Sequence, residues 1–227
     1  MALVFADILV DLTSSGRLSV LDPGILPKDY CQIDLSRAVA RNIPNDLTIP
    51  EECQAYISSE IQKSGRKVAF GGYLEDRLIY HTPQFHEAGE PVRSIHLGVD
   101  FWCEAGTSVF VPVDGIIHSF RDNRDPGNYG PTIILSHSTH DTGWYSLYGH
   151  LSRASLLGLE IGQFMTAGSV LGQIGTIVEN GGYASHLHFQ LVQDLQGMVG
   201  DYPGVCALKD LEFYQNNCPD PNLLLRI

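Results

Sequence analysis

A short run near residue 190 alternates between polar and apolar side chains, and this alternation limits what the chain can fold into. Residues 186–191 read His-Leu-His-Phe-Gln-Leu. Successive side chains of a β-strand point to opposite faces, so His186 and His188 share one face and the three apolar residues share the other. One face can pack into a core while the other carries chemistry. A His-x-His pair alone is weak evidence of metal binding, because such pairs also occur by chance in strands.

A second segment, residues 95–101, repeats the pattern. Its apolar side chains alternate with His96, Gly98 and Asp100, which places these three on one face of a strand. Gly98 has no side chain, so it leaves room for an ion or a substrate to approach the backbone. Two histidines and one aspartate suffice to hold zinc, and three protein ligands leave a fourth position open, as in catalytic sites. The structural alternative is a hydrogen-bonded strand histidine with Asp100 as a turn acid.

A third strand-like segment, residues 144–152, places Tyr148 and His150 on the same side. In chain order, the candidate residues now resemble those of the lysostaphin-type zinc metallopeptidases, bacterial endopeptidases that cut peptidoglycan cross-bridges. Four blocks within residues 92–192 carry the resemblance: His-Leu-Gly-Val-Asp at 96–100, Tyr-Gly-His-Leu-Ser at 148–152, the stretch 162–172, and Ser-His-Leu-His-Phe at 185–189.

The resemblance implies a role for each site residue. His96, Asp100 and His188 would hold Zn²⁺, while His150 and His186 would stand beside the metal-bound water without ligating the ion. Bound zinc lowers the pKa of water from about 15.7 to roughly 7, and imidazoles exchange protons or donate hydrogen bonds at neutral pH. Which of His150 and His186 is the general base stays open. The implied activity is hydrolysis of peptide bonds in glycine-containing or peptidoglycan-like peptides, with a peptide as the partner.

The segment Asn128-Tyr129-Gly130 is similar to family segments near the substrate groove, where Tyr129 would stack on a flat, glycine-rich peptide. A plain turn at Gly127 and Gly130 explains the same residues. The remaining histidines match no family position, and we expect surface or packing roles for them: His81, His86, His118, His137 and His140.

Charge and hydropathy exclude several partners. The net charge of −12, with 14 basic residues that form no cluster, argues against nucleic acid or an anionic membrane surface. No run approaches the roughly 18 apolar residues that span a bilayer, so we expect no membrane insertion. The first eleven residues carry acids and no basic region, unlike a secretory signal. We therefore expect a cytoplasmic protein, or an exported one if a signal was removed.

The five cysteines are odd in number and lack a Cys-x-x-Cys spacing. This pattern fits free thiols in a reducing compartment better than a disulfide framework. Pairing of Cys206 with Cys218 is the alternative.

The pattern of short strands predicts a mainly β, antiparallel, half-barrel-like fold, and the resemblance implies that residues 67–200 form the peptidase domain. A mixed N-terminal segment, 1–66, precedes it, with one helix capped by Thr48 and closed by Gly65. A tail, 201–227, should wrap the domain. Within the domain we expect two hairpins, one over residues 109–117 around an Asp-Gly turn and one from 132 to 148 closed near 141–143.

Two other functions remain open. One is a non-catalytic zinc-binding domain that recognises peptides or acts as a scaffold. The other is a zinc amide hydrolase acting on a small metabolite. Residues 71–80, 200–206 and 218–224 favour the latter, because they resemble a branch of the family found in fusions with sugar-kinase-like and aminotransferase domains. Some members of the family that the chain resembles are held latent by a preceding segment that supplies a fourth zinc ligand. By that resemblance residues 1–66 would cover the groove, with Asn45 or Asp46 as the fourth ligand. Such a site would also accept other divalent ions.

Overall fold

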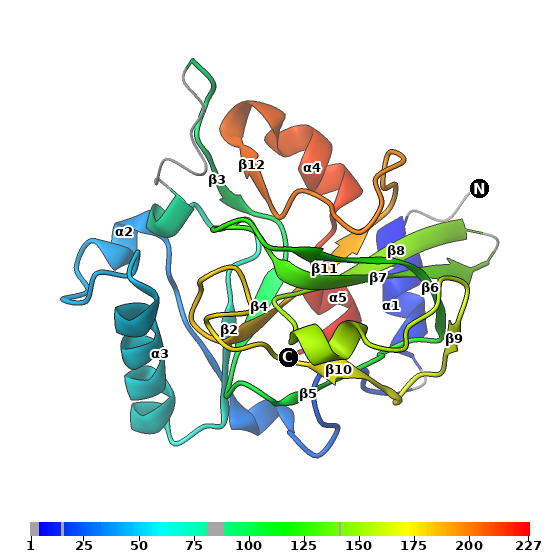
Figure 1. The fold of residues 1–227 in the computed structure, drawn as a ribbon, viewed down its shortest axis with the longest axis horizontal. Helices are drawn as coiled ribbons and strands as arrows, with labels where there is room; N and C mark the ends of the chain where they lie inside the picture. The colour runs from blue at the N-terminus through cyan, green and yellow to red at the C-terminus, as the bar shows by residue number, and fades with distance from the viewer. Residues whose placement is uncertain (1–4, 15, 81–88, 141) are drawn as a thin grey trace.

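The computed structural model describes residues 5–14, 16–80, 89–140 and 142–227. A central sheet dominates it, and the helices lie at its periphery (Figure 1). The helices are α1 (Phe5–Leu12), α2 (Arg37–Ala40), α3 (Pro50–Ser64), α4 (Leu211–Asn217) and α5 (Asn222–Leu225), with short 3-10 turns at Pro27–Asp29, Leu78–Tyr80, Arg153–Leu156 and Leu208–Asp210. The strands are β1 (Tyr30–Gln32), β2 (Val68–Gly71), β3 (Arg93–His96), β4 (Val99–Trp102), β5 (Ser108–Phe110), β6 (Gly115–Asn123), β7 (Gly130–Thr139), β8 (Thr142–Gly149), β9 (Phe164–Met165), β10 (Val170–Gln173), β11 (His186–Val192) and β12 (Val205–Ala207).

Eight of these strands form one sheet in the order β1-β2-β4-β11-β8-β7-β6-β9. Neighbours are antiparallel except β1 and β2, which run parallel. Two small antiparallel sheets pair β5 with β10 and β3 with β12. The prediction of a mainly β, antiparallel fold is confirmed.

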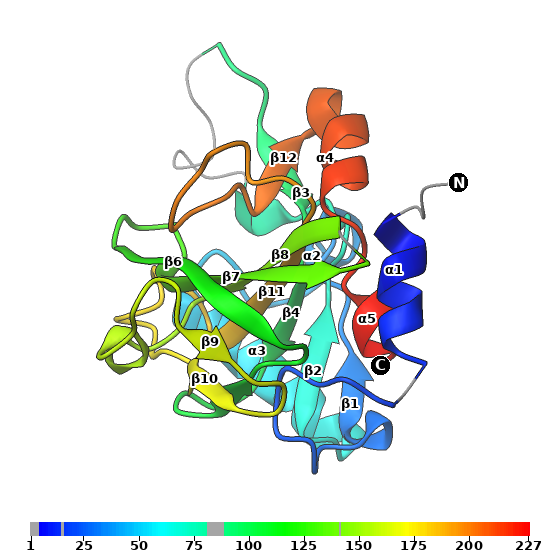
Figure 2. The same cartoon turned by 90° about the vertical axis from the view of Figure 1, so that its right-hand side faces the viewer.

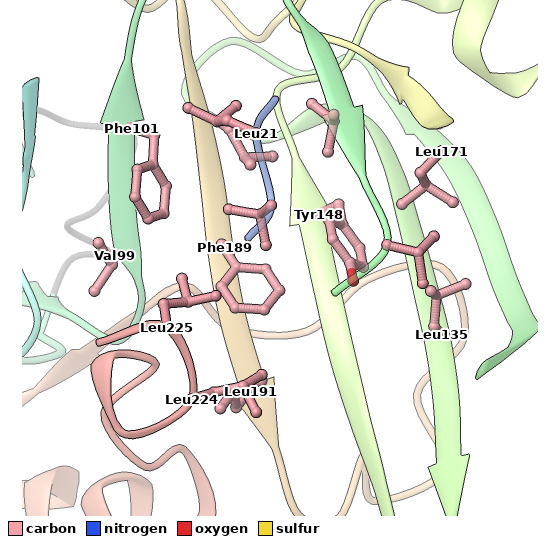
Figure 3. Close-up of a cluster of buried hydrophobic side chains, with 14 of the residues drawn as sticks. Leu21, Val99, Phe101, Leu135, Tyr148, Leu171, Phe189, Leu191, Leu224 and Leu225 are labelled. Atoms are coloured by element: carbon pink, nitrogen blue, oxygen red, sulfur yellow. The ribbon is translucent and has the colours of Figure 1, made fainter. Parts of the chain in front are cut away.

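The apolar face of β11 forms part of the main core. Leu187, Phe189 and Leu191 are fully buried there, and Figure 3 shows the last two beside Leu224 and Leu225 of α5. Burying each such side chain stabilises the fold by about 1.5–3 kcal/mol. The core therefore fixes which face of β11 points away from it, and that face carries the histidines.

Helix α3 ends where the sequence predicted but begins differently. Gly65 closes it in the left-handed conformation at φ 66°, which glycine adopts without steric cost. The predicted cap at Thr48 is wrong, because Ile49 is the N-cap residue and caps nothing with its side chain. The Thr48 hydroxyl instead donates to Asp46 Oδ1 at 2.6 Å, within a turn that precedes the helix.

Both ends of the described chain join the central core. Helices α1 and α5 lie together on one side of the molecule (Figure 2), and Arg226 Nη2 donates to the carbonyl of Val10 at 3.3 Å. The Phe5 ring packs on Trp144 with centroids 5.9 Å apart. The chain ends thus contribute to the same hydrophobic cluster as the sheet, while the boundaries near residues 66 and 200 stay predictions.

The expected single strand over residues 95–101 is two strands. β3 pairs with β12 and β4 pairs with β2 and β11, and a bend at Leu97 and Gly98 separates them. The Leu97 N–H donates to the carbonyl of Gly204 at 2.9 Å. As a result the apolar side chains of this segment pack in two different hydrophobic clusters. Val99 belongs to the main core, and Leu97 belongs to a second, separate cluster of buried residues.

One expected hairpin is present and the other is not. β7 and β8 form the hairpin, with Thr139 paired to Thr142; Asp141, in its turn, lies outside the described residues. The hairpin over residues 109–117 is wrong, because β5 pairs with β10 and β6 with β7 and β9. The Asp114 side chain does not close a tight turn; its Oδ1 accepts the N–H of Ala167 at 2.7 Å.

The cysteines form no disulfide, and the histidines outside the candidate site differ in their exposure to solvent. All five cysteines are free, so Cys206 and Cys218 do not pair here. His137 is buried and His140 is exposed, and His118 lies between these extremes; His81 and His86 fall outside the described residues. Within the described part of the chain, no helix is both long and apolar enough to cross a bilayer.

Candidate metal centre and active site

The order of the central strands brings the candidate residues together. β11 lies between β4 and β8, and its His188 is paired with Asp100 on one side and Gly149 on the other. His150 directly follows Gly149, and His186 is two residues before His188 on the same face of β11. Residues far apart in sequence therefore meet at one point of the sheet.

His96, Asp100 and His188 form the group that can hold a metal ion among the described residues. His96 Nε2 lies 2.9 Å from His188 Nδ1 and 3.3 Å from Asp100 Oδ1. His188 Nδ1 lies 3.1 Å from the same carboxylate oxygen. Ligand atoms about 2.0–2.2 Å from a tetrahedral ion are roughly 3.3–3.5 Å apart. The three atoms therefore already stand close to the spacing of one face of such a tetrahedron.

The proton positions on the two imidazoles also fit a metal. His96 Nδ1 lies 2.9 Å from the carbonyl of Gly72, which can only accept, so this nitrogen carries the proton. Gln190 Nε2 donates to the carbonyl of Pro203 at 3.1 Å, which turns its Oε1 toward His188 Nε2 at 2.9 Å. Lone pairs on His96 Nε2 and His188 Nδ1 consequently converge with the Asp100 carboxylate. A cation relieves the repulsion among these three acceptors, so the residues present fit a bound metal.

The electrostatics favour the protonation states that ligands need. Burial opposes the charge of Asp100, but His96 and Arg77 outweigh it and hold the pKa of that carboxyl well below its usual value. Burial, with the nearby Arg77 charge, lowers the pKa of His96 to about 4. At neutral pH the aspartate is ionised and His96 is neutral, as metal ligands must be.

His150 and His186 lie beside this group and face each other, with ring centroids 4.2 Å apart. Their Nδ1 atoms donate to the carbonyls of Asn180 and Ala184, each at 2.7 Å. Their Nε2 atoms are therefore the ones that remain for chemistry, and His186 Nε2 lies 3.7 Å from Asp100 Oδ1. Burial lowers the pKa of both imidazoles, for His150 well below the usual value. Both are neutral and can accept protons.

The backbone of His150 is strained. Its φ is 63°, in the left-handed region that non-glycine residues rarely adopt. The N–H of His150 donates to the carbonyl of Tyr129, and its carbonyl accepts the N–H of Gly175, each at 2.9 Å. Strain held by surrounding bonds is common at functional sites, and here it places the imidazole against His186.

A pocket of about 540 Å³ opens beside the histidines. Asn128 and Tyr129 line it together with His150 and His188. Tyr129 is only 7% exposed, and its ring packs at 5.0 Å from the His188 centroid and 5.5 Å from that of His150. Little of the Tyr129 ring is thus available for a peptide. The described residues before Tyr80 do not border the pocket. Asp46 Oδ1 is engaged by Thr48 instead.

Gln190 and Arg77 contact the metal group and were not predicted from the sequence. Gln190 shares a strand face with His186 and His188, so alternation alone could have found it. Arg77 donates to Asp100 Oδ2, 23 positions away in sequence, and no local pattern signals that contact. Gly98 also differs from expectation: a side chain there would meet the His188 ring at 2.7 Å. The space at Gly98 is filled by a ligand imidazole rather than left open for a substrate.

Comparison with known families now adds to this geometry. Residues 94–198 match the model of peptidase family M23. This part of the chain is similar to the M23 peptidases. It contains the five residues of the metal group and the histidine pair, and it confirms the resemblance drawn from sequence. The chain is accordingly a hydrolase of the peptidase class, and the match to a peptidase family implies a peptide substrate.

Among solved structures, 28 chains match. The catalytic domain of the antimicrobial peptidase lysostaphin from Staphylococcus simulans is 26% identical, with 54% of this chain and 80% of that one covered and a TM-score of 0.37. Lysostaphin itself is 26% identical, with 53% of this chain and 44% of lysostaphin covered and a TM-score of 0.35. A zinc-containing peptidase from Vibrio cholerae is 22% identical, with 53% of this chain and 32% of that peptidase covered and a TM-score of 0.37. The present chain thus spans less than half the length of lysostaphin and of the Vibrio cholerae peptidase. No curated protein matches.

Proposed function

We propose that this chain is a zinc-dependent endopeptidase that hydrolyses peptide bonds in glycine-containing or peptidoglycan-like peptides. The observation that carries the proposal is the convergence of three metal-ligating atoms, 2.9–3.3 Å apart, beside two neutral imidazoles, with His150 and His188 lining a pocket. A metal group alone would fit a structural site. The adjoining pair of proton acceptors and the pocket distinguish a catalytic one.

In this proposal His96, Asp100 and His188 hold the ion through Nε2, Oδ1 and Nδ1. When bound, zinc supplies Lewis acidity to the water nucleophile and to the scissile carbonyl. The ring nitrogen of each histidine that faces away from the ion is held by a hydrogen bond. The Gly72 carbonyl orients His96, and the Gln190 side-chain carbonyl orients His188. Such contacts set the tautomer of each ligand and the direction of its lone pair.

His150 and His186 then divide the proton chemistry. One Nε2 would take the proton of the attacking water and deliver it to the amine nitrogen that leaves as the C–N bond breaks. The other Nε2 would take up a solvent proton as negative charge develops on the carbonyl oxygen, donate a hydrogen bond to that oxygen, and release the proton when the carbonyl re-forms. The carbonyls of Asn180 and Ala184 hold the opposite nitrogen of each ring, so both rings keep their orientation while the proton moves. The separation of the centroids, 4.2 Å, allows both to reach one substrate group.

The pocket defines where a peptide would lie. Asn128 stands on its wall and is the better placed of the two groove candidates, because its side chain is partly exposed whereas Tyr129 is buried. Tyr129 would act by supporting His150 and His188 from behind. The likeness to lysostaphin makes pentaglycine a sensible first substrate.

The test combines zinc content with hydrolysis of pentaglycine and of muropeptides, by the wild-type chain and by His150→Ala. We expect bound zinc in both proteins and cleavage by the wild type, with turnover reduced by about 10²–10⁴-fold in the variant. Bound zinc without cleavage of any peptide would instead indicate a peptide-recognition or scaffold domain. Cleavage of small amides alone would indicate a metabolite hydrolase.

A further inference from the structure

Arg77 lies outside the M23 match, yet it contacts the candidate metal site directly. Its side chain is 1% exposed. Nη1 donates to Asp100 Oδ2, and Nε donates to Glu75 Oε2 at 2.6 Å. The guanidinium carbon lies 5.5 Å from the centre of the Trp102 ring. Arg77 therefore lies between two carboxylates and the face of an aromatic ring.

Burying an arginine is costly unless its charge and donors are matched. The surrounding residues supply both the opposite charges and the hydrogen-bond acceptors that Arg77 needs. Glu75 and Asp100 compensate the charge, and the carbonyl of Gly71 lies 3.5 Å from Nη2. Gly72, at φ 99°, has no side chain to obstruct the guanidinium; a Cβ there would overlap Nη2. The absence of a side chain at Gly72 thus leaves the space that the Arg77 guanidinium occupies.

The contact divides the two oxygens of Asp100. Oδ2 is held by Arg77, whereas Oδ1 faces the histidines, 3.3 Å from His96 Nε2 and 3.1 Å from His188 Nδ1. A carboxylate whose second oxygen is held in this way presents one oxygen to an ion. Two-oxygen binding would fill a coordination position that a catalytic site keeps open.

We propose that Arg77 is a positioning residue that keeps Asp100 a single-oxygen ligand and so preserves an open position on the metal. The inference rests on the metal site of the proposed function. It also ties the N-terminal region to that site, because Glu75 Oε1 accepts the N–H of Leu35 at 3.0 Å. A hydrogen-bonded path then runs from Leu35 through Glu75 and Arg77 to Asp100.

The test uses Co²⁺ as the probe metal, because four-coordinate cobalt absorbs visible light far more strongly than five- or six-coordinate cobalt. Cobalt is titrated into the metal-free full chain, as wild type, Arg77→Gln, Arg77→Lys and Glu75→Gln. Glu75→Gln is the matched control, since it disturbs the same buried ion-pair network without removing a contact to Asp100. Thermal unfolding of each protein checks that it folds.

We expect intense visible bands for the wild type and for Glu75→Gln. Arg77→Gln should lose band intensity and bind cobalt about 10–100-fold more weakly, with partial rescue in Arg77→Lys, which retains one donor. Equal losses in Arg77→Gln and Glu75→Gln would overturn the inference, as would an unchanged Arg77→Gln spectrum. A wild type that binds no cobalt would contradict the proposed function itself.

A second measurement does not depend on folding of the variants. In a crystal structure of the zinc-loaded wild type, we expect Asp100 to bind through Oδ1 alone, with Oδ2 still on Arg77. Binding through both oxygens, or an Arg77 turned away from Asp100, would overturn the inference.

Discussion

His137 is a buried histidine away from the metal group, and burial disfavours its charged form. Nδ1 lies 2.8 Å from the carbonyl of Asp114, and Nε2 lies 2.7 Å from the Ser146 hydroxyl. Its ring stacks on Trp144 with centroids 4.0 Å apart. Burial lowers the pKa of His137 to about 4, against weaker opposing effects of Asp114. The packing role expected for it from sequence agrees with these contacts.

This burial predicts a pH dependence of stability. The unfolded chain takes up a proton at His137 near pH 6.5, whereas the folded chain does so only near pH 4. The stabilisation is therefore complete above about pH 6.5 and is lost as the pH falls toward about 4. The full gap corresponds to about 3 kcal/mol.

His137→Gln removes this titration while keeping one donor and one acceptor. Urea unfolding at a series of pH values should show the wild-type free energy of unfolding falling relative to that of the variant, by up to about 3 kcal/mol between pH 7 and pH 4. A difference that stays constant over this range would show that His137 does not have a lowered pKa.

At the level of strands, β3, β4 and β11 each contribute one residue to the metal group, and the bend between β3 and β4 is essential to it. Gly98 lies in that bend, and a Cβ there would come within 2.7 Å of both the His188 ring and the carbonyl of Phe189. An added methyl group would therefore displace the His188 imidazole, and relieving the clash with the carbonyl would also shift the β11 backbone that carries His188. The glycine is therefore required by the ligand geometry.

Gly98→Ala should weaken zinc binding about 10–100-fold, because the displaced imidazole no longer directs Nδ1 at the ion. Gly143→Ala is the control: it lies on β8 of the same sheet, and the nearest atom to an added Cβ is 4.0 Å away. Competition with a chromogenic chelator measures both affinities. If the two variants bind zinc equally well, the close approach at Gly98 has no bearing on the site.

The strand pattern also shows what the sequence could predict. Strict alternation identified the chemical face of β11, because the period of two follows directly from strand geometry. It failed at residues 95–101, where β3 leaves the main sheet, since a change of partner strand leaves no mark on local periodicity. The same limit explains the incorrect hairpin at 109–117. An Asp-Gly pair signals a turn, but the 166–169 loop engages Asp114 from outside it.

Across the whole molecule, the metal group couples ligand binding to stability. Three acceptors meet in a buried site among strands that also carry the main core. Any ion that binds the folded chain alone stabilises it, by about 2.7 kcal/mol at 100 times its Kd. For a chain of this size that corresponds to roughly 5–10 °C in Tm.

Chelation should therefore lower Tm by roughly 5–10 °C, and added zinc should restore it. Differential scanning calorimetry with and without EDTA measures the shift. An identical Tm under both conditions would mean that no ion contributes to the folded state.

The wider arrangement of the site was only partly predictable. His96, Asp100, His150, His186 and His188 could be named because each belongs to a local motif. Arg77 and the tail residue Pro203, which orients Gln190, could not, because their contacts arise from packing between distant segments. The sequence thus predicts which atoms can bind a metal, and the fold determines what holds those atoms in place.

The central claim is that His188 binds the metal while His186, two residues away on the same strand face, does not. Zinc content of the purified wild type, His188→Ala and His186→Ala tests it directly. The structure predicts about one zinc ion per chain in the wild type and in His186→Ala, and none in His188→Ala. Loss of zinc from His186→Ala as complete as that from His188→Ala would contradict the assignment.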